Sequence, residues 1–157
     1  MEETKREFTL TIDQKLIDRY NSYYLLCNPR RKKIPIARPT HESINTWSVM
    51  KRLSVNALKQ RWKEFIIWWI EEEELNGLGL DEFDMHFTSY MPTRRRSDPD
   101  NYVPKFILDG FTESGFIVDD NGQHLKTLSL STDYDKDNPR TEIKITVYKE
   151  KQNERRS

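Results

Sequence analysis

The chain has 157 residues, the size of one ordinary domain, and its apolar fraction of 35% suffices for one modest core. Its 26 basic and 26 acidic residues give zero formal net charge, so a polyanion would have to be bound by local basic patches. One cysteine, Cys27, excludes a disulfide framework and a cysteine zinc site. The longest apolar run, residues 65–70, is too short to span a bilayer, and the charged N-terminus lacks the apolar core of a signal peptide. We therefore expect a cytoplasmic protein with no membrane partner.

The first half of the chain predicts a strand, a basic loop and a long helix. Every second residue is apolar over residues 7–12, which is typical of a half-buried strand. Residues 28–38 combine five basic residues with two prolines, and a third proline follows at residue 39, a composition that indicates an exposed loop. Apolar residues recur at spacings of three and four over residues 54–76 and predict the main helix, with Ser54 as N-cap and Gly77 beyond its end.

This main helix has apolar residues around most of its circumference, because Ile66, Ile67, Trp68 and Ile70 add to the regular apolar stripe. Such a helix should be covered on more than one side. Two arrangements satisfy the pattern, a core helix within a monomer and a helix that contacts a second subunit, and we favour the homodimer.

The second half predicts three more strands and a second helix. The strands are expected at residues 83–90, 125–131 and 142–148, and the helix at residues 104–114, with Pro104 at its first position and Gly115 at its end. These elements predict an α+β fold. We expect one domain at residues 1–150, with a small mixed sheet of about four strands packed by two or three helices, and a flexible tail at residues 151–157.

The segment of residues 94–120 has the most distinctive chemistry, because three arginines precede five aspartates: Asp98, Asp100, Asp109, Asp119 and Asp120. At an effective dielectric constant of about 20, two unit charges about 4 Å apart repel by about 4 kcal/mol. Converging carboxylates must therefore protonate, separate or bind a cation. Pro99 favours an extended conformation at the preceding residue, which would project Asp98 and Asp100 to the same side.

If Asp120 returns across the turn to Asp98 and Asp100, the three carboxylates would offer oxygen ligands. Such a set suits Mg²⁺ or Mn²⁺ far better than zinc. The alternative is that these aspartates are solvated loop residues and helix caps, and for an isolated D-x-D pair this alternative is the better one.

In the pattern and order of its residues, this segment resembles the RusA family of Holliday-junction resolvases, which occurs widely in phages and prophages. An arginine-rich lead-in is followed by D-x-D-N at residues 98–101, a lysine, an aspartate before glycine and an aromatic, and a closing G-hydrophobic-D-D motif at residues 115–120. Residues 140–150 also resemble the last strand of the family. One departure is that three residues, 102–104, separate the asparagine from the lysine, where two are more usual.

The resemblance implies a homodimeric, magnesium-dependent endonuclease that resolves four-way DNA junctions. By that resemblance, Asp98, Asp100 and Asp120 would be the metal-binding catalytic carboxylates and Lys105 the matching lysine, with Asn101, Asp109 and Asp119 in support. The expected DNA contacts are Arg94, Arg95, Arg96, Arg30, Arg31, Lys32 and Lys33. Three alternatives stay open: a non-catalytic DNA-binding relative of the same fold, an unrelated metal-dependent transferase, and a regulatory or anti-defence protein whose acids merely solvate a loop.

Overall fold

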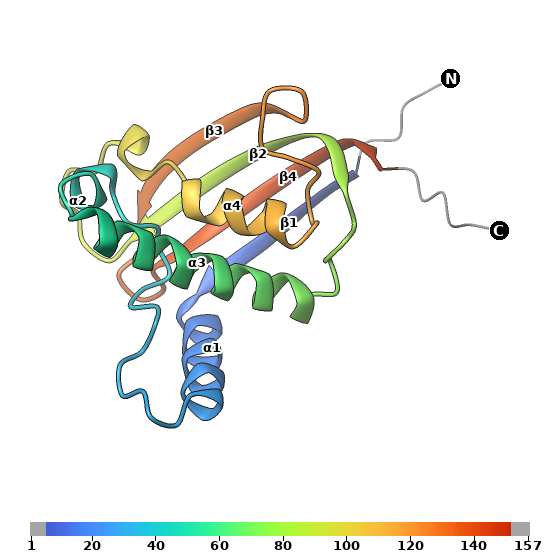
Figure 1. The fold of residues 1–157 in the computed structure, drawn as a ribbon. Helices are drawn as coiled ribbons and strands as arrows, with labels where there is room; N and C mark the ends of the chain where they lie inside the picture. The colour runs from blue at the N-terminus through green and yellow to red at the C-terminus, as the bar shows by residue number, and fades with distance from the viewer. Residues whose placement is uncertain (1–5, 152–157) are drawn as a thin grey trace, which may run out of the picture.

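A four-stranded sheet with helices across one face organises the chain in the computed structural model, which describes residues 6–151 (Figure 1). The elements in chain order are β1 (Arg6–Asp13), α1 (Gln14–Cys27), α2 (Ile44–Trp47), α3 (Arg52–Glu72), β2 (Leu80–Met91), the 3₁₀ helix η1 (Pro99–Tyr102), α4 (Lys105–Glu113), β3 (Leu125–Tyr134) and β4 (Arg140–Glu150). The strand order is β1-β4-β2-β3. β4 is antiparallel to both neighbours, whereas β2 and β3 are parallel. The prediction of a single α+β domain with a mixed sheet is confirmed.

The core lies between the sheet and the two helices that cross it, α3 and α4 (Figure 1). Strand residues alternate between this core and the open face, as the two-residue period of a strand requires. The two helices approach closely at Gly110, where an added Cβ would lie 2.5 Å from Cβ of Ile66. A glycine is therefore needed at the contact between α3 and α4.

The boundaries of both predicted helices differ from the expectation. α3 begins at Arg52 and ends at Glu72, so Ser54 lies inside the helix and is not its N-cap. The turn after α3 includes Glu74, which has a left-handed φ of 58°. At α4, Pro104 is the N-cap and not the first helical residue. Apolar periodicity could not predict that α3 ends at Glu72, because residues 71–74 are all glutamates and carry no apolar side chain.

Helix α1 was not predicted from the sequence. Its start is capped by Asp13, whose Oδ1 accepts a hydrogen bond from the backbone N–H of Leu16 at 2.9 Å. The helix leads into the basic loop, where the structure has neither helix nor strand, as expected. Asn21 attaches α1 to this loop, because its Nδ2 donates to the Ile36 carbonyl at 2.9 Å and its Oδ1 accepts from the Ile36 N–H at 3.3 Å.

The apolar circumference of α3 is largely covered within one chain. Ile66 and Ile70 are fully buried, and α1 places Tyr20 against Trp68, with ring centroids 5.2 Å apart. Burial inside the monomer therefore accounts for most of the pattern that suggested a partner subunit. None of the helices within residues 6–151 combines the length and the apolar character that crossing a membrane requires. Lys151 is the first residue of the expected tail, and its backbone N–H donates to the Gly79 carbonyl at 2.7 Å. Residues 152–157 lie outside the described part of the chain.

Candidate active site

The acids of the D-x-D-N motif lie on the connection between β2 and α4, which is attached at two points. The Thr132 hydroxyl of β3 donates to the Ser97 carbonyl at 3.1 Å. On the other side, the Asn45 N–H of α2 donates to Oδ1 of Asn101 at 3.1 Å. Asn101 therefore has a structural contact, and these bonds hold the motif between the end of β3 and α2.

Asp98 and Asp100 do not form the extended pair that was expected, and that prediction is wrong. Asp98 has extended backbone angles, φ −91° and ψ 123°, but Asp100 lies within η1. A 3₁₀ helix has three residues per turn, so side chains two residues apart no longer project to one side. Oδ1 of Asp98 lies 3.3 Å from Nε of Arg96, and both side chains are largely exposed. An exposed pair of this kind contributes at most about 1 kcal/mol.

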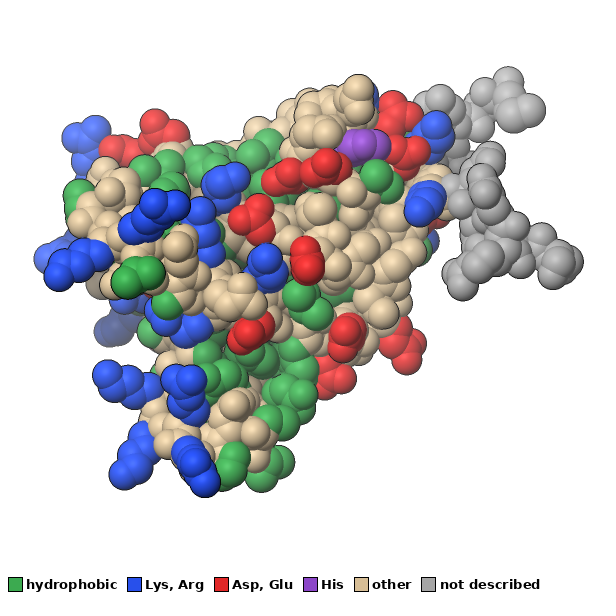
Figure 2. Space-filling view, viewed as in Figure 1, with side chains coloured by type: hydrophobic (Ala, Val, Ile, Leu, Met, Phe, Trp, Pro, Cys, Tyr) green, Lys and Arg blue, Asp and Glu red, His purple; other side chains and the backbone are tan. Residues whose placement is uncertain are grey.

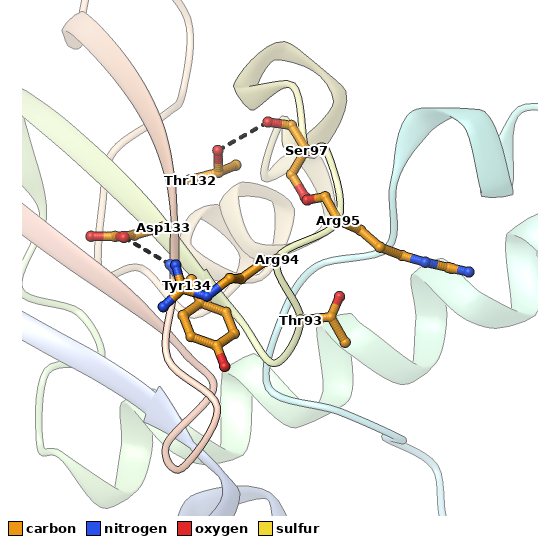
Figure 3. A pocket seen from close by; sticks show the side chains of 7 residues that line it. All are labelled: Thr93, Arg94, Arg95, Ser97, Thr132, Asp133 and Tyr134. Atoms are coloured by element: carbon orange, nitrogen blue, oxygen red, sulfur yellow. Dashed lines mark hydrogen bonds between the residues drawn. The ribbon is translucent and has the colours of Figure 1, made fainter.

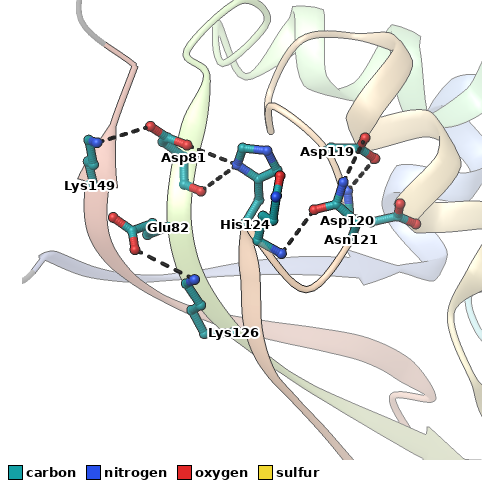
Figure 4. Close-up of polar contacts among 9 residues, drawn as sticks. Asp81, Glu82, Asp119, Asp120, Asn121, His124, Lys126 and Lys149 are labelled. Carbon is teal, nitrogen blue, oxygen red and sulfur yellow. Dashed lines mark hydrogen bonds and ion pairs between the residues drawn. The ribbon is translucent and has the colours of Figure 1, made fainter.

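A second group of acids lies at the other end of α4, on the turn that precedes β3 (Figure 4). The Asp120 N–H donates to Oδ1 of Asp119 at 2.7 Å, and Nδ2 of Asn121 donates to Oδ2 of Asp119 at 3.3 Å. Partial burial raises the pKa of Asp120, and the neighbouring carboxyl groups of Asp119 and Asp109 raise it further. Crowded carboxylates thus disfavour the charged form here, as electrostatics requires.

The structure does not gather Asp98, Asp100 and Asp120 around one point. Within residues 6–151, no three His, Cys, Asp or Glu side chains are placed so that they could hold a metal ion. Asp98 and Asp100 precede the first turn of α4, and Asp120 follows its last turn. The donor chemistry nevertheless suits Mg²⁺ or Mn²⁺, because the acids offer only oxygen and the raised pKa of Asp120 marks a place where a cation would relieve repulsion.

Lys105 is the first residue of α4, and its side chain is exposed. The sequence places Asp109 four residues later on the same helix, so the two residues lie on one face, as predicted. Lys105 therefore lies at the end of α4 nearer to the D-x-D-N motif, and Asp109 lies about one turn further on, in the middle of the helix.

Positive charge collects on one side of the molecule although the net charge is zero. Figure 2 shows Lys and Arg side chains over α2, the start of α3 and the loop after α1, whereas most Asp and Glu side chains in this view lie elsewhere. The predicted DNA contacts are all exposed: Arg30, Arg31, Lys32, Lys33, Arg94, Arg95 and Arg96. Local patches of this kind are what a neutral chain needs to bind a polyanion.

A pocket of about 290 Å³ opens between the arginine segment and the end of β3 (Figure 3). Its lining residues are Thr93, Arg94, Arg95, Ser97, Thr132, Asp133 and Tyr134. Thr132 and Tyr134 were not predicted as site residues, because the predicted strand ended at residue 131 and no local signal shows that β3 pairs beside the end of β2. In the structure Tyr134 is opposite Met91 in that parallel pairing.

No protein-family model matches the chain, and a search of the curated proteins gives no match.

Proposed function

We propose that the chain is a divalent-cation-dependent endonuclease that cleaves branched DNA, with four-way junctions as its substrate. The observation that carries this proposal is the crowded acid group around Asp120, which lies in the same segment as the exposed arginines. The order of the acids, lysine and closing aspartates in that segment is the order that resembles the RusA family.

Asp98, Asp100 and Asp120 would hold the cation in this proposal. A bound Mg²⁺ would polarise the scissile phosphate and promote ionisation of the attacking water. The acids form two groups in the structure, so Asp98 and Asp100 must approach Asp120 when DNA is bound, by a movement of residues 98–104. Few side-chain hydrogen bonds oppose that movement, since those of residues 98–104 are the contacts of Asp98 with Arg96 and of Asn101 with Asn45.

The remaining polar residues would bind and orient the DNA. Lys105 would neutralise negative charge that develops on the phosphate. Arg94, Arg95 and Arg96, together with the basic loop, would contact phosphates on either side of the cut, which provides affinity with little sequence information.

The proposal includes a homodimer whose interface is an aromatic and apolar patch on α1 and α3. Tyr23 is 48% exposed and Leu26 81% exposed on α1, and the Tyr23 ring stacks on Trp68 with centroids 5.8 Å apart. Two sites related by a two-fold axis would match the near two-fold symmetry of a four-way junction.

A second candidate function is DNA binding without cleavage. The separation of Asp98 and Asp100 from Asp120 favours it, because no complete set of ligands exists within residues 6–151 as the structure describes them. A relative of the same fold that lacked the chemistry would keep the basic surface and lose cation-dependent cleavage.

Cleavage of a synthetic four-way junction, measured with and without Mg²⁺, separates the two candidates. For the endonuclease we expect cleavage only with Mg²⁺, and we expect Asp100→Asn to abolish it while junction binding persists. Asp137→Asn, which changes an exposed acid on the turn after β3, is the matched control and should cleave normally. Cleavage by Asp100→Asn at the normal rate would refute the assignment, and Mg²⁺-independent binding with no cleavage by the unaltered protein would establish the second candidate.

A further inference from the structure

The pocket beside β3 is lined mostly by groups that favour an anion. Two guanidinium groups and one carboxylate give the lining a net charge of +1, and its other four residues carry hydroxyl groups: Thr93, Ser97, Thr132 and Tyr134. The carboxylate is that of Asp133, whose Oδ1 already accepts the Tyr134 N–H at 2.8 Å. In Figure 3 the Asp133 side chain points away from Arg94 and Arg95. The Arg95 side chain extends away from Arg94 in the same view, so Arg94 is the arginine that places positive charge beside the Tyr134 ring.

Arg94 is held in place by an aromatic ring. Its guanidinium carbon lies 4.1 Å from the centroid of the Tyr134 ring. A cation over a ring face is attracted by the ring quadrupole, and stacking leaves the N–H groups at the edge of the guanidinium free to donate. A guanidinium fixed in this way loses less freedom on binding a ligand than a mobile one does.

Neither pocket arginine is neutralised by an acid within the described chain. Arg96 pairs with Asp98, and Arg140 pairs with Asp135 and Glu142, but no ion pair within residues 6–151 involves Arg94 or Arg95. The Arg140 guanidinium also lies over a ring, that of Tyr90, at 3.8 Å. Two similar arginine–tyrosine pairs therefore differ in one respect, since only the pair in the pocket has its charge available to a ligand.

We infer that this pocket binds one phosphate group of the DNA strand, and that Tyr134 is a positioning residue that presents Arg94 to it. The inference rests on the proposed function, because DNA supplies the phosphate. Planar guanidinium groups bind phosphate oxygens through two parallel N–H donors, which fits Arg94 as the ring fixes it. Asp98 lies four residues after Arg94 on the same segment, so the bound phosphate would be near the cut and not at a remote point of the duplex.

Substitution of the ring tests this inference through the salt dependence of binding, measured in EDTA so that cleavage plays no part. Tyr134→Ala should weaken junction binding about tenfold and reduce the slope of log K against log salt by about 0.9, the value for one phosphate contact. Tyr134→Phe keeps the ring and should bind normally. Tyr90→Ala is the matched control, because it removes a ring beneath an arginine that acids already neutralise, and it should leave the slope unchanged. Thermal melting of each variant checks that it is folded.

A direct probe uses the side-chain Nε–H NMR signal of Arg94. A dinucleotide, which carries one phosphodiester group, should shift this signal, and the two corresponding nucleosides, which carry no phosphate, should shift it much less. Equal shifts, an unchanged slope for Tyr134→Ala, or equal losses in Tyr134→Phe and Tyr134→Ala would each overturn the phosphate pocket. If the unaltered protein cleaves junctions in that case, the proposed function survives. If the unaltered protein binds no DNA, the proposed function and the pocket both fail.

Discussion

The buried imidazole of His41 should make the stability of the protein fall between pH 7 and pH 4. His41 is 3% exposed and stacks on Trp62 and Phe106. The Phe106 N–H donates to Nε2 of His41 at 3.0 Å, so Nδ1 carries the proton and donates to the Glu42 carbonyl at 2.7 Å. A second proton, on Nε2, would point toward the Phe106 N–H and would be buried without a hydrogen-bond acceptor. Burial accordingly lowers the pKa of His41 to about 4.

The size of the effect follows from the difference between the folded and unfolded pKa values of this histidine. The unfolded chain has a histidine pKa of about 6.5, so between pH 6.5 and pH 4 it binds a proton that the folded chain does not. Stability is therefore complete above pH 6.5 and is lost as the pH falls. A difference of about 2.5 pH units corresponds to about 3 kcal/mol of unfolding free energy.

Urea unfolding at pH 7 and pH 4 measures this loss in the unaltered protein and in His41→Gln. The glutamine oxygen can accept the Phe106 N–H but does not titrate. The unaltered protein should lose about 3 kcal/mol more than the variant, since carboxylates common to both cancel in the comparison. His86→Gln, which removes a histidine from the open face of the sheet, should keep the full loss. Equal losses in the unaltered protein and His41→Gln would refute the reasoning.

Three further substitutions test other parts of the fold. Gly110→Ala should lower the unfolding free energy in urea by about 1–3 kcal/mol, because the new methyl group would overlap Ile66; unchanged stability would contradict the close contact. Asn21→Ala removes both hydrogen bonds to the backbone of Ile36 and should lower the unfolding free energy by about 1–3 kcal/mol. It should also speed tryptic cleavage of the basic loop, and an unchanged cleavage rate would mean that other contacts hold the loop. Asp120→Asn should raise the melting temperature at pH 7, because the raised pKa of Asp120 means that folding disfavours its charged form, and the gain should vanish at a pH low enough to protonate this carboxyl in both the folded and the unfolded chain. A lower melting temperature at pH 7 would contradict the crowding of these acids.

Elements with a local signal could be predicted from the amino-acid sequence. Alternating apolar residues marked the strands because a strand buries every second side chain, as β2 and β4 do. Gly115 marked the end of α4 because it adopts a left-handed φ of 76° there. The order of acids between residues 98 and 120 was also readable, because chemical type and spacing are properties of the chain alone.

Which of these features lie close together depends on how the chain packs. The tertiary structure placed β3 beside β2, which brought Tyr134 under Arg94 and formed a pocket from segments about forty residues apart. It also kept Asp98 and Asp100 at one end of α4 and Asp120 beyond the other. The physical reason is that distances between segments are set by helix length and by packing against the sheet, and neither strand order nor crossover path is encoded in a local pattern.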